Sequence, residues 1–108
     1  MATNDQPQDS VTVNGKVYKF KFPSLRIARE AMKLGYKGNF GERWDKAETD
    51  DEEFKKMFES WPQFVSTVID GDVSEIDSLD KITYMEALSI DLGFTKWGSA
   101  VRPNSANG

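Results

Sequence analysis

Hydrophobic and polar residues alternate on both sides of an Asn-Gly pair near the start of the chain. The segment 11–13 (VTV) precedes Asn14-Gly15, and the segment 16–22 (KVYKFKF) follows it. Asn-Gly readily adopts the two positive φ angles of a type I′ turn, whose twist suits a two-residue hairpin loop. The pattern therefore predicts a β-hairpin in which Val13 pairs with Lys16.

This register separates a hydrophobic face of the hairpin from a polar one, because alternate residues of a strand share a face. The two strands of a hairpin are only marginally stable alone in water. We therefore expect helices, or another subunit's sheet, to cover the hydrophobic face. That face carries Val11, Val13, Tyr18, Phe20 and Phe22, and the polar face carries Ser10, Thr12, Val17, Lys19 and Lys21.

The next segment, 24–34, has the spacing of a helix that begins after Ser24. A serine hydroxyl at this position can accept a hydrogen bond from the first turn, and Gly35 is the residue type that often follows the last turn. We expect small and hydrophobic residues to pack inward and charged residues to point outward. The inward set is Leu25, Ala28, Ala31, Met32 and Gly35, and the outward set is Arg26, Arg29, Glu30 and Lys33.

Residues 35–43 carry three glycines and the aromatic residues Tyr36 and Phe40, and Trp44 follows them. This composition predicts a loop. Its aromatic side chains can either fold back onto the core or dock a partner. We favour the first alternative, because small domains use loop aromatics to close the ends of their cores.

Hydrophobic residues over 54–69 recur at intervals of three and four, which predicts a long amphipathic helix. Thr49 and Glu52 have the spacing of a capping box at its start. Pro62 interrupts the pattern, since proline removes a backbone donor and clashes with the previous turn. The segment is therefore either one kinked helix or two helices, with Ser60 as the cap of the second. We expect this hydrophobic ridge to cover the aromatic face of the hairpin.

Acidic residues dominate the segment 70–82, which predicts a loop held by hydrophobic anchors at every third position. Asp70, Asp72 and Ser74 have the alternate spacing with which a calcium loop of the EF-hand type begins. The glycine and glutamate positions of that motif are here Glu75 and Lys81. We therefore expect a solvated acidic loop. The anchors are Val73, Ile76, Leu79 and Ile82.

A second capping-box signature, Thr83 with Glu86, follows this loop. It predicts a helix that continues to about Leu92, with Gly93 as the residue after its last turn. We expect order to fade beyond this point, where Trp97 can still pin the chain to the core.

Two strands followed by helices predict an α+β fold. We expect an N-terminal β-hairpin packed on three to four helices, with disordered or extended termini. The 108 residues suit one domain of the usual size. The predicted division is a flexible tail over 1–10, a single domain over 11–97 and a second flexible tail over 98–108.

The chain contains neither cysteine nor histidine. Disulfides, thiolate nucleophiles, zinc bound by cysteine or histidine, and Ser-His-Asp chemistry are therefore excluded. Carboxylates cluster over 48–53, but a helix N-terminus stabilises their charged form, which is the opposite of what a general acid needs. The glycines match no nucleotide-binding fingerprint. We predict no catalytic, cofactor or metal-binding residues, and therefore no enzyme.

The formal net charge of −4 is unevenly distributed along the chain. Residues 1–46 hold nine basic and five acidic residues, a balance of +4, whereas residues 47–108 hold five and thirteen, a balance of −8. Such halves can attract each other within one subunit or head to tail between subunits, or they can be solvated faces of unrelated elements. No segment has the ~18 consecutive apolar residues of a membrane span, and the polar start lacks the pattern of a secretory signal.

The segments VTVNGKVYKFKFPS (11–24) and SLDKITYMEALSIDLGF (78–94) resemble parts of small phage tail-assembly proteins, the tail assembly chaperones. The resemblance implies a mostly helical protein without catalytic activity. It also implies oligomerisation around the tape measure protein while the tail is built. No binding residue of that family can be carried over to a position of this chain.

These observations predict a non-enzymatic phage-type assembly or virion protein in the host cytoplasm or the virion. It would self-associate as a homo-oligomer or bind a phage structural protein, without a membrane. The alternative is a small regulator that binds a host enzyme or nucleic acid through the basic hairpin and first helix. The acidic chain and the lack of a four-stranded platform disfavour nucleic acid. Candidate partner-binding residues are Tyr18, Lys19, Phe20, Lys21, Arg26, Arg29, Tyr36, Phe40, Trp44 and Trp97.

Overall fold

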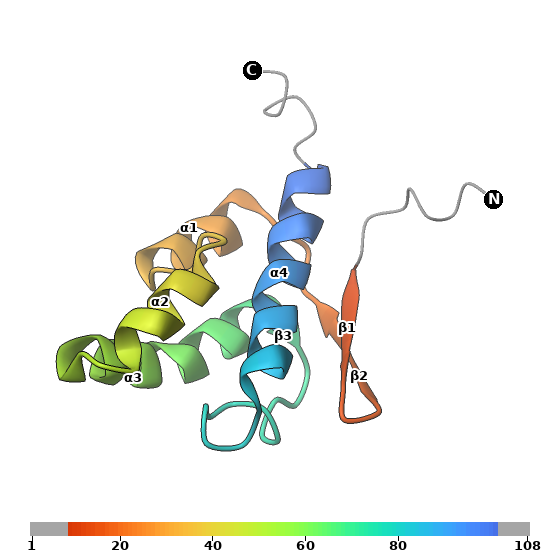
Figure 1. Ribbon diagram of the computed structural model, residues 1–108. Helices are drawn as coiled ribbons and strands as arrows, with labels where there is room; N and C mark the ends of the chain where they lie inside the picture. Colours follow the sequence, from red (N-terminus) through yellow and green to blue (C-terminus); the bar gives the residue numbers. More distant parts are fainter. Residues whose placement is uncertain (1–8, 102–108) are drawn as a thin grey trace.

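The computed structural model describes residues 9–101 and has an α+β fold with an N-terminal hairpin, as the sequence predicts (Figure 1). Within these residues, a three-stranded antiparallel sheet of order β1-β2-β3 accompanies four helices. Of the tails expected over 1–10 and 98–108, residues 1–8 and 102–108 lie outside the described residues, whereas Ser10 belongs to β1 and 98–101 belong to α4. The elements are β1 (Ser10–Val13), β2 (Lys16–Phe20), α1 (Leu25–Lys33), α2 (Phe40–Ala47), α3 (Asp51–Val68), β3 (Ile69–Asp70) and α4 (Tyr84–Val101).

The hairpin has the predicted turn and register. Asn14 and Gly15 have φ angles of 52° and 80°, and Val13 pairs with Lys16. The predicted hydrophobic face is buried except for Phe22, which is 70% exposed. The prediction for Phe22 is wrong because β2 ends at Phe20, so the alternation of the strand stops before it.

Helix α4, and not the expected ridge of α3, covers the hairpin (Figure 1). The rings of Phe20 and Phe94 meet edge to face with centroids 5.7 Å apart. The Phe94 ring also meets the Phe64 ring of α3 edge to face, with centroids 6.3 Å apart. Phe94 of α4 therefore contacts both the aromatic face of the hairpin and the core face of α3.

A two-residue strand that the sequence did not predict, β3, joins the sheet directly after α3. Ile69 pairs with Phe20, and Asp70 pairs with Lys19. The Lys21 amide also donates to the Val68 carbonyl at 2.8 Å. These bonds attach the end of α3 to the end of the hairpin.

Helix α1 begins and ends as predicted, but its buried side differs. The Ser24 hydroxyl accepts a hydrogen bond from the Ile27 amide, and Gly35 follows the helix with φ 92°. Leu25 and Met32, expected to pack inward, are 82% and 57% exposed. The inward side consists of the buried Ala31 with the half-buried Ile27 and Leu34, whose spacing of three and four residues places them on one face.

Residues 35–43, predicted to be a loop, contain the start of a helix. Helix α2 begins at Phe40, inside the glycine-rich segment. Tyr36 and Phe40 are buried, so the prediction that these aromatics fold back onto the core is confirmed. Gly41 lies within α2, where an added Cβ would approach the Tyr84 hydroxyl to 3.3 Å. Packing against α4 therefore accounts for a glycine that the sequence suggested was a loop residue.

Helix α3 is continuous through Pro62, so the alternative with two helices is wrong. Its N-cap is Asp50, whose carboxylate accepts hydrogen bonds from the amides of Glu52 and Glu53. The N-cap predicted at Thr49 is therefore displaced by one residue to Asp50, and the predicted capping box does not form. The core-facing residues of α3 lie on both sides of Pro62, and their burial offsets the missing hydrogen bond.

The acidic loop and the start of α4 follow the prediction, whereas the end of α4 does not. Thr83 and Glu86 form the capping box reciprocally, with bonds of 2.9 and 3.1 Å. The helix then passes through Gly93 and runs to Val101, so the expected end near Leu92 is wrong. Phe94 and Trp97 both pack on the core, and this packing outweighs the cost of about 1 kcal/mol for a glycine inside a helix.

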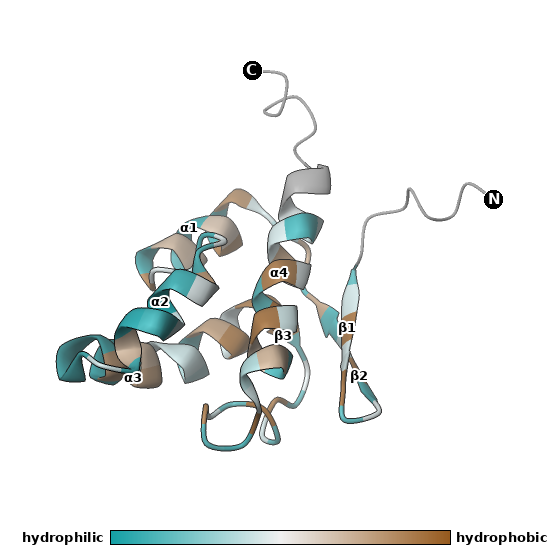
Figure 2. Cartoon of the chain, viewed as in Figure 1, coloured by the Kyte–Doolittle hydropathy of each residue, from teal (hydrophilic) through white to brown (hydrophobic). Residues whose placement is uncertain are grey.

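The core contains a cluster of aromatic rings. Tyr36 stacks on Phe64 with ring centroids 4.2 Å apart, and Trp61 lies 5.5 Å from both Phe40 and Phe64. Figure 2 shows hydrophobic residues of α3 and α4 where the two helices approach each other, whereas α2 and the first turns of α3 are mainly hydrophilic. In this view a continuous hydrophilic stretch therefore runs over α2 and the first turns of α3.

Candidate interaction surfaces

Four of the aromatic residues predicted as partner-binding candidates are core residues. Tyr18, Phe20, Tyr36 and Phe40 are all buried. The Tyr36 hydroxyl lies 2.9 Å from the Ser60 hydroxyl, and burial raises the pKa of Tyr36. These side chains are therefore closed to a partner in the folded chain.

The candidates Lys21 and Trp97 are engaged within the chain. The Lys21 ammonium donates to the Ser66 carbonyl at 3.1 Å. The Trp97 indole donates to the Lys21 carbonyl at 3.2 Å. Lys19 is exposed on the hairpin, opposite Asp70 of β3. Of the two basic candidates on the hairpin, Lys21 is therefore engaged within the chain, whereas Lys19 is exposed.

The outer side of α1 forms an exposed surface that combines hydrophobic and basic residues. An α-helix turns by about 100° per residue, so Leu25, Arg29 and Met32 lie opposite the inward face of α1. Arg26 and Lys33 flank them, and all five side chains are exposed. We call this set the α1 surface. Among the described residues neither arginine forms an ion pair within the chain; Lys33 lies 3.7 Å from Glu30.

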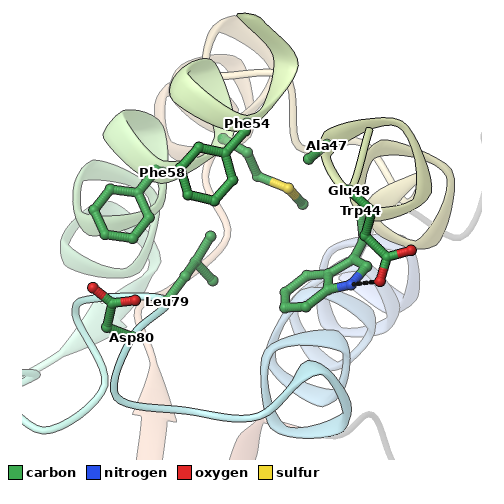
Figure 3. A pocket seen from close by; sticks show the side chains of 8 residues that line it. Trp44, Ala47, Glu48, Phe54, Phe58, Leu79 and Asp80 are labelled. Carbon is green, nitrogen blue, oxygen red and sulfur yellow. Dashed lines mark hydrogen bonds between the residues drawn. The ribbon is translucent and has the colours of Figure 1, made fainter. Parts of the chain in front are cut away.

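A pocket of about 350 Å³ opens between α2, α3 and the acidic loop (Figure 3). In Figure 3, Phe54, Phe58 and Leu79 lie on one side of it, and Trp44 lies across from them. Phe54 is 53% exposed, and its ring stacks on Phe58 with centroids 5.5 Å apart. We call this cavity the α2–α3 pocket. Its lining is Trp44, Ala47, Glu48, Phe54, Met57, Phe58, Leu79 and Asp80.

The charged groups that line this pocket are both acidic. The Glu48 carboxylate accepts a hydrogen bond from the Trp44 indole at 3.1 Å through one of its oxygens. Asp80 is exposed, and among the described residues its carboxylate forms no ion pair. An apolar pocket with carboxylates at its edge suits a hydrophobic group that is flanked by positive charge.

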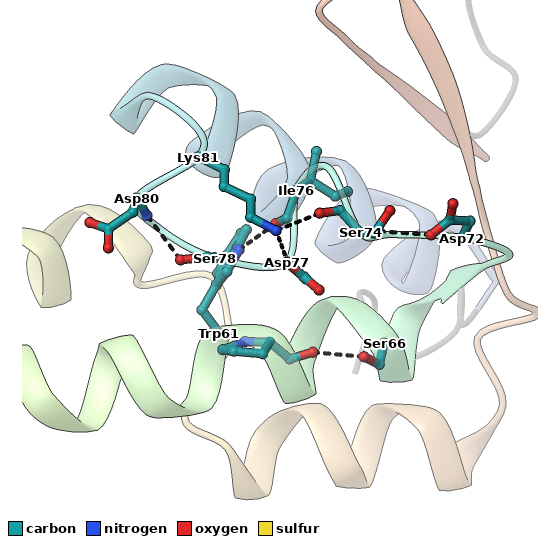
Figure 4. A network of polar contacts seen from close by, with 10 residues as sticks. Trp61, Ser66, Asp72, Ser74, Ile76, Asp77, Ser78, Asp80 and Lys81 are labelled. Carbon is teal, nitrogen blue, oxygen red and sulfur yellow. Dashed lines mark hydrogen bonds and ion pairs between the residues drawn. The ribbon is translucent and has the colours of Figure 1, made fainter.

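The acidic loop is held together by its own side chains and by α3 (Figure 4). The Trp61 indole donates to the Ile76 carbonyl at 2.9 Å. The Lys81 ammonium donates to the Ser74 carbonyl at 2.7 Å and to the Asp77 carboxylate at 3.0 Å. The positive charge that contacts the oxygens of this loop is therefore the ammonium group of Lys81.

Asp91 of α4 is the one buried carboxylate among the described residues and is 1% exposed. Its Oδ2 atom has no hydrogen-bond partner. Burial raises the pKa of Asp91 to about 6, and the positive charge of Arg43 opposes this shift. The Arg43 guanidinium itself lies over the Tyr36 ring at 4.7 Å and donates to the Leu34 carbonyl.

Sequence reasoning identified Arg26 and Arg29 of the α1 surface and Trp44 of the pocket, but it missed the other residues that line the pocket. Phe54 and Phe58 were assigned to the core because they fit the helical spacing of α3. Phe58 lies about 100° around the helix axis from Met57, at the edge of the buried face. Helical spacing alone therefore did not distinguish Phe54 and Phe58 from the core residues of α3, because their positions around the helix axis adjoin those of buried residues.

Within the described residues, no three acidic side chains come together in a way that could hold a metal ion. No helix over 9–101 is long and apolar enough to cross a membrane. No protein-family model, curated protein or solved structure matches the chain.

Proposed function

We propose that this chain is a non-enzymatic interaction protein that self-associates. The observation that supports the proposal is the α1 surface, where Leu25 and Met32 are 82% and 57% exposed on one side of a helix. Burying one such side chain in an interface contributes about 1.5–3 kcal/mol to the free energy of binding. A partner that covers both would therefore gain a substantial free energy of binding.

The arrangement of ionisable groups supports a non-catalytic role. A general acid at neutral pH needs a raised pKa and access to a substrate. Asp91 has the raised pKa, but it is buried and lies outside the lining of the α2–α3 pocket. The carboxyl groups that do line the pocket, Glu48 and Asp80, are exposed to solvent.

The setting that we propose is phage tail morphogenesis, with a phage structural protein as a second partner. The resemblance of segments 11–24 and 78–94 to tail assembly chaperones supports this part of the proposal. Assembly would then occur in the host cytoplasm, and the protein could be retained in the virion.

Size-exclusion chromatography with light scattering tests the proposal. We expect the average mass of the wild-type protein to rise with concentration and to fall between about 50 and 500 mM salt, because salt screens attraction between exposed charges. Replacing Leu25 by Glu should reduce the mass to that of a monomer. Val17→Glu, at an exposed residue of β2, is the matched control and should leave association unchanged.

A wild-type protein that stays monomeric at every concentration, and binds no co-encoded protein, would refute the proposal. The alternative function, a regulator acting through basic residues, is favoured by the exposure of Lys19, Arg26 and Arg29. Salt-sensitive binding of a host enzyme or nucleic acid that is lost on combining Lys19→Glu with Arg26→Glu would support that alternative.

A further inference from the structure

We infer that the α2–α3 pocket of one copy receives the α1 surface of a second copy, which gives a head-to-tail contact. The inference rests on the self-association proposed above and names the two surfaces that form it. Both surfaces belong to the same chain, so the contact can repeat from copy to copy.

The two surfaces have matching hydrophobic character. Leu25 and Met32 are seven residues apart on α1, a separation of about 10 Å along the axis at 1.5 Å per residue. A helix docks by inserting side chains of this spacing into an apolar groove. The α2–α3 pocket offers the exposed ring of Phe54 beside Phe58, and its volume of about 350 Å³ suits side chains projected from a helix.

The charges at the two surfaces are complementary. Arg26 and Arg29 form no ion pair among the described residues, and they flank the exposed leucine of α1. At the pocket, Glu48 has one oxygen free of the Trp44 indole, and Asp80 is exposed. Placing the basic helix over the acidic edge of the pocket pairs groups that are unpaired in the single chain.

The same charges disfavour a symmetric dimer. Pairing two α1 surfaces would bring the arginines of both copies together, and pairing two pockets would bring their carboxylates together. Like charges brought into contact oppose association. A head-to-tail contact brings opposite charges together instead.

The positions of the surfaces prevent this contact within one copy. Figure 4 shows α3 between α1 and the loop that carries Asp80. Helix α1 uses its inward face to pack on α3, so its outer face points away from the pocket. A contact between different surfaces of identical chains forms a ring if the rotation closes and an open filament if it does not.

Two variants, each defective in one surface, test the inference. Leu25→Glu removes the α1 surface and leaves the pocket intact, and Phe54→Glu does the reverse. We expect each variant alone to associate at least about tenfold more weakly than the wild type, since a central interface anchor carries a large share of the binding energy. A mixture of the two should form a 1:1 heterodimer and nothing larger, because the remaining surfaces both carry an added glutamate.

Controls make the outcome interpretable. Met85→Glu, at an exposed residue of α4 that belongs to neither surface, should associate like the wild type. Circular dichroism should show the same helix content for all three variants. As a second test that keeps both anchors, a chain with Arg26→Glu, Arg29→Glu, Glu48→Arg and Asp80→Arg should self-associate, whereas either pair of reversals alone should not.

Different failures point to different conclusions. If the wild type associates but the mixture forms no heterodimer, the head-to-tail contact is wrong and the proposed self-association stands. If Phe54→Glu alone dimerises as the wild type does, a symmetric α1 contact replaces the inference. If the wild type is monomeric throughout, both the inference and the proposed function are lost.

Discussion

At the scale of single residues, Asp91 makes the stability of the fold depend on pH. Its pKa of about 6 in the folded chain lies above the ordinary value of about 3.9. A group with a raised folded pKa contributes most stability below its unfolded pKa and loses it as pH rises through the folded pKa. We expect the free energy of unfolding to fall by about 2–3 kcal/mol from this residue between pH 4 and pH 7.

Urea unfolding of the wild type and Asp91→Asn at pH 4.5 and 7.5 measures this effect. The amide cannot ionise, so the variant should be more stable than the wild type at pH 7.5 and should lose less stability between the two pH values. Asp45→Asn, at an exposed residue of α2, is the matched control and should follow the wild type. Equal pH dependence in all three proteins would contradict the assignment.

For single residues, the sequence predicts burial well where a hydrophobic residue shares one face of a long helix with many other hydrophobic residues. Trp61 and Phe64 were expected in the core and are buried there. Leu25 was expected inside and is exposed, because the direction of a short helix depends on which neighbour it packs against. That neighbour, α3, is distant in sequence, so no local pattern could identify the inward face of α1.

At the scale of elements, the two predicted capping boxes differ, and this difference can be measured. Thr83 caps α4, whereas Thr49 is displaced from α3 by Asp50. Thr83→Ala should therefore lower the free energy of unfolding by about 1 kcal/mol. Thr49→Ala is the matched control and should change it by less than about 0.5 kcal/mol. Chemical denaturation of both variants measures the difference, and equal effects would contradict the structure.

Local signals predicted the elements that local chemistry defines. The Asn14-Gly15 turn, the Ser24 cap and the register of the hairpin each depend on neighbours in sequence, and all three are confirmed. Strand β3 forms only because it pairs with β2, and the last turns of α4 are held by packing on the core. Their boundaries were therefore not visible in the sequence, where Gly93 indicated an end.

At the scale of the whole molecule, the contact between α4 and the hairpin should make these two parts open together. Trp97→Ala removes the hydrogen bond to Lys21 and part of the cover over the hairpin. We expect faster amide hydrogen exchange over 11–20, with little change in α2. Met85→Ala, at an exposed position of the same helix, is the control. Unchanged exchange in the hairpin would show that α4 does not protect it.

The candidate interaction site could be predicted only in part at this scale. The division into a basic and an acidic half was readable from the sequence, and so were the arginines of α1. The α2–α3 pocket was not, because it forms where Trp44, Phe54 and Leu79 meet from three separate segments. A pocket of this kind exists only after the chain has folded.

The position of α4 over the hairpin also affects how the chain folds as it leaves the ribosome. The bond between Lys21 and Trp97 joins residues 76 positions apart. Synthesis proceeds at roughly 5–20 residues per second, so the hairpin emerges seconds before the helix that shields it. During that interval its hydrophobic face is open to water, and the nascent chain is most vulnerable to aggregation before α4 has been translated.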